Sequence, residues 1–180
     1  QWDQANALAI GPGTEKIVLA GRTLSNYALV KYNTNGTLDP NFGLNGKAIY
    51  TIGSMSEIIN TIYINPDGKI VAGGTSQTGS NTDMALMRFL NNGQIDNAFG
   101  ANGISLFDLG GTDILFSIVP QGDYLVGAGS SYIGAAGDFV ALRFDTIGAF
   151  DYVFNNMVGF NITSFGNSSG ANAVAVQQPD

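Results

Sequence analysis

The chain repeats itself about every 55 residues, and this repetition limits its possible folds more than any other feature. Three related segments, KIVLAG at 16–21, KIVAGG at 69–74 and YLVGAG at 124–129, recur at spacings of 53 and 55 residues. A second set, ALVKYNTNG, ALMRFLNNG and VALRFDTIG, begins at positions 28, 85 and 140. A unit of this length buries its apolar faces only against neighbouring units. The chain is therefore expected to be a repeat protein.

Each repeat predicts four short strands, which in the first repeat cover 7–10, 17–20, 27–32 and 48–52. These segments are rich in Val, Ile, Leu, Phe and Tyr, and Gly, Asn, Asp and Pro bound them. The third is apolar almost throughout, which indicates burial on both faces. The pattern predicts an all-β fold without α-helix, namely the four-stranded antiparallel blades of a β-propeller. A β-sandwich and an open β-solenoid are the alternatives.

The spacing divides the chain into three blades, at 1–56, 57–113 and 114–170, and the first strand of a fourth repeat at 171–180. Three blades alone would leave apolar faces and strand edges bare. We therefore expect either completion by further sequence or association of copies. In the second case, residues 171–176 could join a neighbouring chain's sheet by strand exchange.

Composition excludes several classes of function. The net charge of −7 argues against nucleic acid as a partner, because no basic surface is available to displace counterions. No apolar run reaches the roughly 20 residues of a membrane-spanning helix, so membrane insertion is not expected. Cysteine and histidine are absent, and Glu15 and Glu57 are the only glutamates. Without these common catalytic groups, the sequence predicts a protein that is not an enzyme.

The repeated motifs resemble the delta-60 repeat of bacterial β-propeller proteins. The similarity is clearest at 26–46, at 66–74 and at 83–103, where "DGKIVAGG" is followed by "DMALMRFLNNGQIDNAFGANG". The third copy departs from the pattern, since Asn155 stands where the family has glycine. The resemblance implies an extracellular or cell-surface bacterial propeller without an established activity. The expected function is a non-catalytic scaffold, adhesion or protein-interaction module that can assemble with itself. A lectin-like binder of glycans or small ligands is the alternative.

An aspartate recurs three residues after a glycine in the loop before each fourth strand, as Asp39, Asp96 and Asp151. A carboxylate here is expected to accept backbone N–H groups and cap the turn. The alternative is a calcium loop, because the surrounding residues faintly echo Asp-x-Asp-x-Asp-Gly sequences. Calcium binding is then expected around Asp145 and Asp151, and no other cofactor is expected.

A cation near the end of each third strand, Lys31, Arg88 or Arg143, recurs with a polar residue five positions earlier. Such residues either bridge neighbouring blades or form a recognition ring with one cation per blade. The earlier polar residues are Asn26, Asp83 and Asp138.

Long loops rich in Ser, Gly and Thr are expected after the second strand in the second and third repeats, at 76–80 and 130–136, and loops commonly carry binding surfaces. Their proposed partner-facing residues are Ser76, Thr78, Ser80, Ser130, Ser131 and Tyr132. Three unrepeated acids, Asp108, Asp113 and Asp123, mark a second irregular region. Glycan binding would require repeated aromatic platforms, but the only tryptophan is Trp2.

Overall fold

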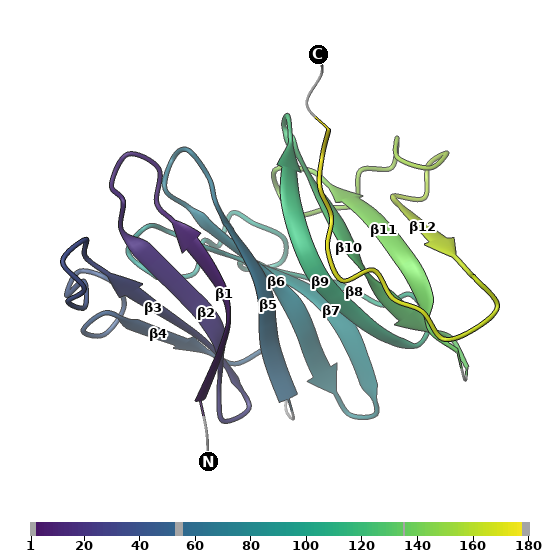
Figure 1. The fold of residues 1–180 in the computed structure, drawn as a ribbon, viewed down its shortest axis with the longest axis horizontal. Coiled ribbons are helices and arrows are strands. Elements are labelled where there is room, and N and C mark those ends of the chain that lie inside the picture. Colours follow the sequence, from purple (N-terminus) through teal and green to yellow (C-terminus); the bar gives the residue numbers. More distant parts are fainter. Residues whose placement is uncertain (1–2, 53–55, 135, 178–180) are drawn as a thin grey trace.

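The computed structural model describes residues 3–52, 56–134 and 136–177, which form twelve β-strands and no helix (Figure 1). The strands form a four-stranded sheet, β1 to β4, and an eight-stranded sheet, which consists of the units β5 to β8 and β9 to β12. These three units follow one another from left to right in Figure 1, and we call them blades 1, 2 and 3. Within these described ranges there is consequently no helix that could cross a membrane. The expected all-β architecture is confirmed.

Every blade is an antiparallel sheet whose strands lie in sequence order, with one hairpin after another. Blades 2 and 3 are joined through a single parallel pair between Thr82 and Thr112. Blade 1 contains β1 (Asp3–Ile10), β2 (Ile17–Thr23), β3 (Asn26–Tyr32) and β4 (Lys47–Tyr50); blade 2 contains β5 (Ser56–Ile64), β6 (Ile70–Thr78), β7 (Asn81–Phe89) and β8 (Ile104–Phe107); blade 3 contains β9 (Thr112–Gln121), β10 (Tyr124–Tyr132), β11 (Asp138–Phe144) and β12 (Phe160–Thr163).

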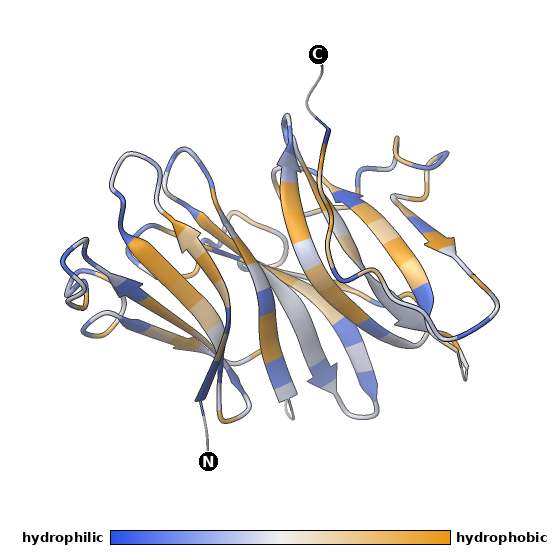
Figure 2. Ribbon diagram, in the orientation of Figure 1, coloured by the Kyte–Doolittle hydropathy of each residue, from blue (hydrophilic) through white to orange (hydrophobic). Residues whose placement is uncertain are grey.

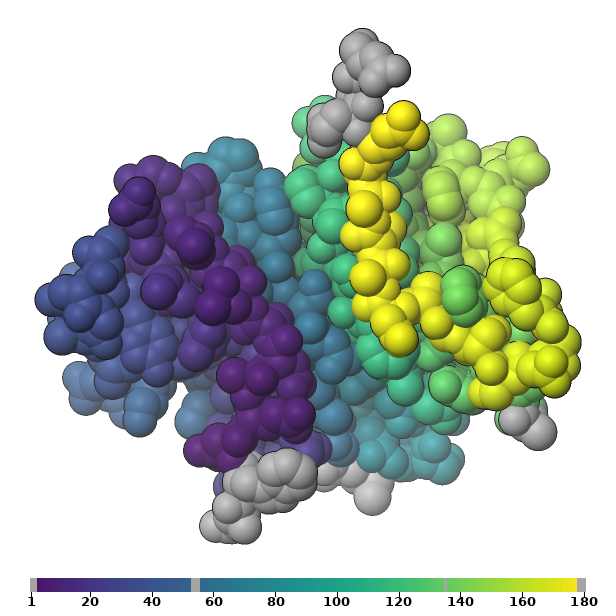
Figure 3. Space-filling view, viewed as in Figure 1, coloured from purple at the N-terminus to yellow at the C-terminus, as the bar shows by residue number. Residues whose placement is uncertain are grey.

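The predicted first strand of a fourth repeat is not formed over the part that the structure describes, 171–177; positions 178–180 lie outside the described residues. Two strands must pair to form a sheet, and no described segment pairs with this one. Its backbone makes one described contact with blade 3, a 3.1 Å hydrogen bond from the Ala171 N–H to the Gly129 carbonyl. Figure 3 shows the segment as a yellow ridge over the green strands of blade 3.

The first strand of each blade contains a β-bulge opposite a glycine of the second strand. In blade 2 the register shifts between Ile59 and Thr61, and Ile59 faces Gly74. The bulged residue is Asn60, whose side chain donates a 3.0 Å hydrogen bond to the carbonyl of Leu115 in blade 3. Asn6 does the same from blade 1 to Ile59. The bulge therefore aims a polar side chain at the next blade.

Burial of the third strands depends on whether a blade has two neighbours. In β7 every residue from Met84 to Phe89 is buried. In β3 and β11 buried residues largely alternate with more exposed ones, because only one side of each end blade is covered by another blade. The prediction of burial on both faces is thus confirmed for blade 2 and wrong for the two end blades. Figure 2 shows apolar residues on β1 and β2 of blade 1.

Candidate functional site

The aspartate of each c–d loop, the connection between the third and fourth strands, makes the same backbone contact in every blade. One carboxylate oxygen accepts the N–H two residues later, at 3.2 Å for Asp39, 3.2 Å for Asp96 and 3.1 Å for Asp151. All three side chains are buried. Each carboxylate therefore holds the first turn of its loop.

The second oxygen of each aspartate accepts a hydrogen bond from a cationic side chain of the same blade. Asp96 binds the Arg88 Nε at 2.8 Å, and Asp151 binds the Arg143 Nε at 2.6 Å. In blade 1 the cation is Lys16, whose Nζ lies 2.9 Å from Asp39. In blades 2 and 3 these bonds join the recurrent aspartate to the recurrent cation of the third strand, whereas in blade 1 Lys16 takes this role.

These contacts also affect ionisation. Burial alone would raise the pKa of Asp96, but hydrogen bonds from Ala98 and Arg88 outweigh it and lower that pKa. The pKa of Asp39 is lowered in the same way, because bonds from Lys16 and the Asn41 N–H outweigh burial. Burial lowers the pKa of Lys31. The carboxylates are therefore held in their charged form.

The cations of the third strands also reach the next blade. Lys31 donates a hydrogen bond of 2.9 Å to the carbonyl of Asn91. Arg88 donates one of 2.5 Å to the carbonyl of Thr146, which is the residue equivalent to Asn91 one blade later. At blade 3 the guanidinium of Arg143 instead donates to Gln121 of its own blade, at 3.1 Å.

A phenylalanine of the c–d loop also reaches the next blade from blades 1 and 2. Phe42 lies against Gly93 and Phe99 lies against Gly148, where a Cβ would be 3.0 Å and 2.4 Å from the ring. Both rings are essentially inaccessible to solvent, whereas the equivalent Phe154 of blade 3 is only half-buried. Its ring contacts Arg143, whose guanidinium carbon lies 5.2 Å from the ring centre.

The backbone beside each phenylalanine makes a third link. The N–H of Gly43 donates a hydrogen bond of 2.8 Å to the carbonyl of Asn92. The N–H of Gly100 donates one of 2.7 Å to the carbonyl of Ile147. The equivalent residue of blade 3 is Asn155, and its φ of 53° matches the 52° of both glycines. We call Arg143, Phe154 and Asn155, which lie at equivalent positions to residues that contact the next blade, the end face.

The expected calcium residues have other contacts in this structure. Asp145 accepts the N–H groups of Ile147 and Ala149, at 3.0 and 2.9 Å, while Asp151 is bonded to Arg143. Calcium at this pair stays a prediction.

The expected partner-facing rim is wrong for half of its residues. Ser76, Ser130 and Ser131 are buried within β6 and β10. Their hydroxyl-rich sequence indicates a loop, but the strands extend through them because the neighbouring strands pair along their full length. Thr78 and Ser80 are exposed at the β6–β7 hairpin, and Tyr132 is half-buried at the end of β10.

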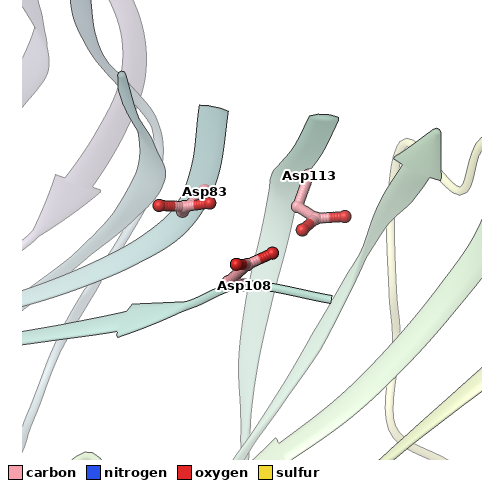
Figure 4. A group of neighbouring side chains, drawn as sticks. All are labelled: Asp83, Asp108 and Asp113. Carbon is pink, nitrogen blue, oxygen red and sulfur yellow. The ribbon is translucent and has the colours of Figure 1, made fainter. Parts of the chain in front are cut away.

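The unrepeated acids are only partly brought together. Asp108 and Asp113 lie close to Asp83, with one carboxylate oxygen of each within 4.8 Å of the others (Figure 4). Asp123 is exposed beyond the opposite end of β9. Sequence reasoning did not single out Asp83 here, because its closeness to Asp113 depends on the pairing of β7 with β9. Burial, reinforced by the charges of Asp108 and Asp113, raises the pKa of Asp83.

One family model matches the chain, at residues 15–42 and 65–99, and its description is a domain of unknown function (DUF5122) beta-propeller. The matched segments include β2 and β3 of blade 1 and β6 and β7 of blade 2, each with the start of its c–d loop. The chain has the β-propeller fold. A search of curated proteins finds no match. Trp2 lies outside the described residues, and glycan binding by this propeller stays a prediction.

Proposed function

We propose that this propeller is a non-catalytic interaction module of a secreted or surface-associated bacterial protein, and that its end face binds blade 1 of a second copy. The resemblance to delta-60 repeats supports the surface setting. The observation that carries the proposal is the repetition of the inter-blade contacts. A cation, a phenylalanine and a backbone N–H of one blade meet the c–d loop of the next blade twice in this chain.

The same three groups are present on blade 3 as Arg143, Phe154 and Asn155, and none of them contacts a further c–d loop within 3–52, 56–134 and 136–177. A surface that continues an existing interface favours another blade of the same kind as its occupant.

Blade 1 offers the matching surface. Gly36 is equivalent to Gly93 and Gly148 and has the same backbone shape, with φ of 82° against 82° and 85°. No heavy atom lies within 4 Å of a Cβ placed at Gly36, so its surface is open to a phenylalanine. The apolar side chain of Ile49 in β4 of the same blade is 57% exposed. Burial of such side chains supplies the main driving force for association.

The segment 171–176 would lie where the first strand of an incoming blade packs. Its sequence, ANAVAV, equals the ANALAI of 5–10 at four of six positions. We therefore expect it to replace β1 of the second copy and pair with the second copy's β2, which is the strand exchange expected from the sequence.

Cross-linking of engineered cysteines tests this arrangement, because the natural chain contains none. Asn155 is the equivalent of Gly43, and Asn35 is the equivalent of Asn92 in blade 1. The backbone hydrogen bond from Gly43 to Asn92 therefore predicts that Asn155 of one copy meets Asn35 of another. We expect a covalent dimer when the Asn155→Cys and Asn35→Cys variants are mixed and oxidised, and no dimer from either variant alone. Mixing is informative because a head-to-tail contact joins two different positions.

A Phe154→Ala change in the Asn155→Cys chain serves as the matched variant. It removes the aromatic anchor, so the yield of the mixed dimer should fall about tenfold. A monomeric wild-type chain without cross-linking in the mixture would overturn the proposal. Dimers from a single variant would indicate a symmetric contact instead, which also contradicts it.

A further inference from the structure

Three carboxylates converge where blade 2 meets blade 3, away from the end face. Asp83 lies in β7, Asp108 follows β8, and Asp113 lies near the start of β9. One oxygen of each lies within 4.8 Å of the others, and this is the only such group of three acids among the described residues. Figure 4 shows the three side chains facing one another across the junction.

Two of the carboxylates have buried oxygens without a hydrogen-bond partner. Asp113 is completely buried, and while its Oδ2 accepts the Leu109 N–H at 2.7 Å, its Oδ1 has no partner. The Oδ1 of Asp83 is also buried without one. A buried carboxylate oxygen that lacks a donor destabilises a protein unless a positive charge compensates it.

The preceding junction shows how the same position is built without three acids. Asn26, Thr51 and Glu57 are the equivalents of Asp83, Asp108 and Asp113. Glu57 accepts the N–H of Ile52, as Asp113 accepts that of Leu109. There the Thr51 hydroxyl donates 2.9 Å to the Asn26 side-chain oxygen. At the second junction both of these positions hold aspartates, so a carboxyl group stands where Thr51 provides its hydroxyl.

We propose that Asp83, Asp108 and Asp113 bind a hard divalent cation, calcium in particular, which joins blade 2 to blade 3. Calcium takes six to eight oxygen ligands at about 2.3–2.6 Å and accepts carboxylates from flexible sites. Asp108 is exposed, so water has access to complete the coordination. The site stands independently of the docking proposed for the end face.

Calcium titration of the purified chain tests the site by calorimetry and by thermal unfolding. We expect saturable binding and a rise in melting temperature of about 5 °C once calcium exceeds its dissociation constant about 100-fold. The Asp108→Asn variant should lose both responses. The Asp83→Asn variant should lose them too, and its melting temperature without calcium should exceed that of the wild type because like charges are removed.

Asp145→Asn is the matched control, since it removes a carboxylate from the alternative calcium loop and should leave both responses unchanged. Sodium chloride at equal ionic strength separates binding from charge screening, and magnesium tests selectivity for the larger ion. Loss of the response in Asp145→Asn, with retention in Asp108→Asn, would overturn the site. Absence of saturable binding by the wild type would do so as well.

Discussion

Replacing Gly74 with alanine is expected to lower the free energy of unfolding by about 3 kcal/mol. The added Cβ would lie 1.9 Å from the carbonyl oxygen of Ile58 and 3.0 Å from the Cα of Ile59. Both are backbone atoms of the β-bulge, so they cannot move aside as a flexible side chain would. The bulge also aims Asn60 at blade 3. Urea denaturation followed by circular dichroism measures the loss.

Gly79→Ala is the matched substitution, because it adds the same methyl group in the β6–β7 hairpin. No heavy atom lies within 4 Å of that position, and only the φ of 65° opposes alanine. Its expected cost is about 1 kcal/mol. Equal losses in the two variants would show that crowding at the bulge does not constrain the sequence.

An Asp96→Asn change is expected to cost about 3 kcal/mol at pH 7. The amide oxygen can still accept the Ala98 N–H, so the change removes chiefly the negative charge. Arg88, of which 9% of the side chain is exposed, would then lack its counter-ion, and Lys69 would lose a carboxylate at 3.3 Å. Burial of an unpaired guanidinium is the dominant cost. Chemical denaturation of the two proteins measures the difference.

The pH dependence gives this prediction a second readout. Since the pKa of Asp96 is lowered in the folded state, its carboxylate stabilises the fold above its unfolded pKa of about 3.9. That contribution is lost as the pH falls through the folded pKa. The difference between wild type and variant should therefore be full at pH 7 and shrink below about pH 4.

Asp67→Asn is the appropriate comparison for Asp96→Asn. Asp67 also lies near Lys69, at 3.8 Å, but its side chain is exposed. An exposed ion pair contributes about 0.5 kcal/mol or less. A comparable loss in both variants would mean that the cluster around Asp96 acts as an ordinary surface pair.

The repeat made the fold predictable from the sequence, because recurring KIVLAG-like and ALVKY-like segments fix both the number and the type of strands. Strand ends were less predictable. Ser130 and Ser131 have the composition of a loop, and only pairing with β9 and β11 keeps them in a strand. The cluster of Asp83, Asp108 and Asp113 depends on two blades meeting, a contact that spacing within one repeat does not encode. The Gly74 bulge likewise requires knowledge of the strand register.

The inter-blade bonds give the molecule a direction. Lys31, Asn6 and the Gly43 N–H all donate from blade 1 to blade 2. Arg88 and Asn60 donate hydrogen bonds from blade 2 to blade 3. One bond has the opposite direction, because the Ile118 N–H of blade 3 donates to the Thr61 hydroxyl of blade 2. Ribosomes make the amino-terminal blade first. Each finished blade can therefore emerge with its donor groups in place, as a template on which the next blade is ordered while the chain is still being synthesised.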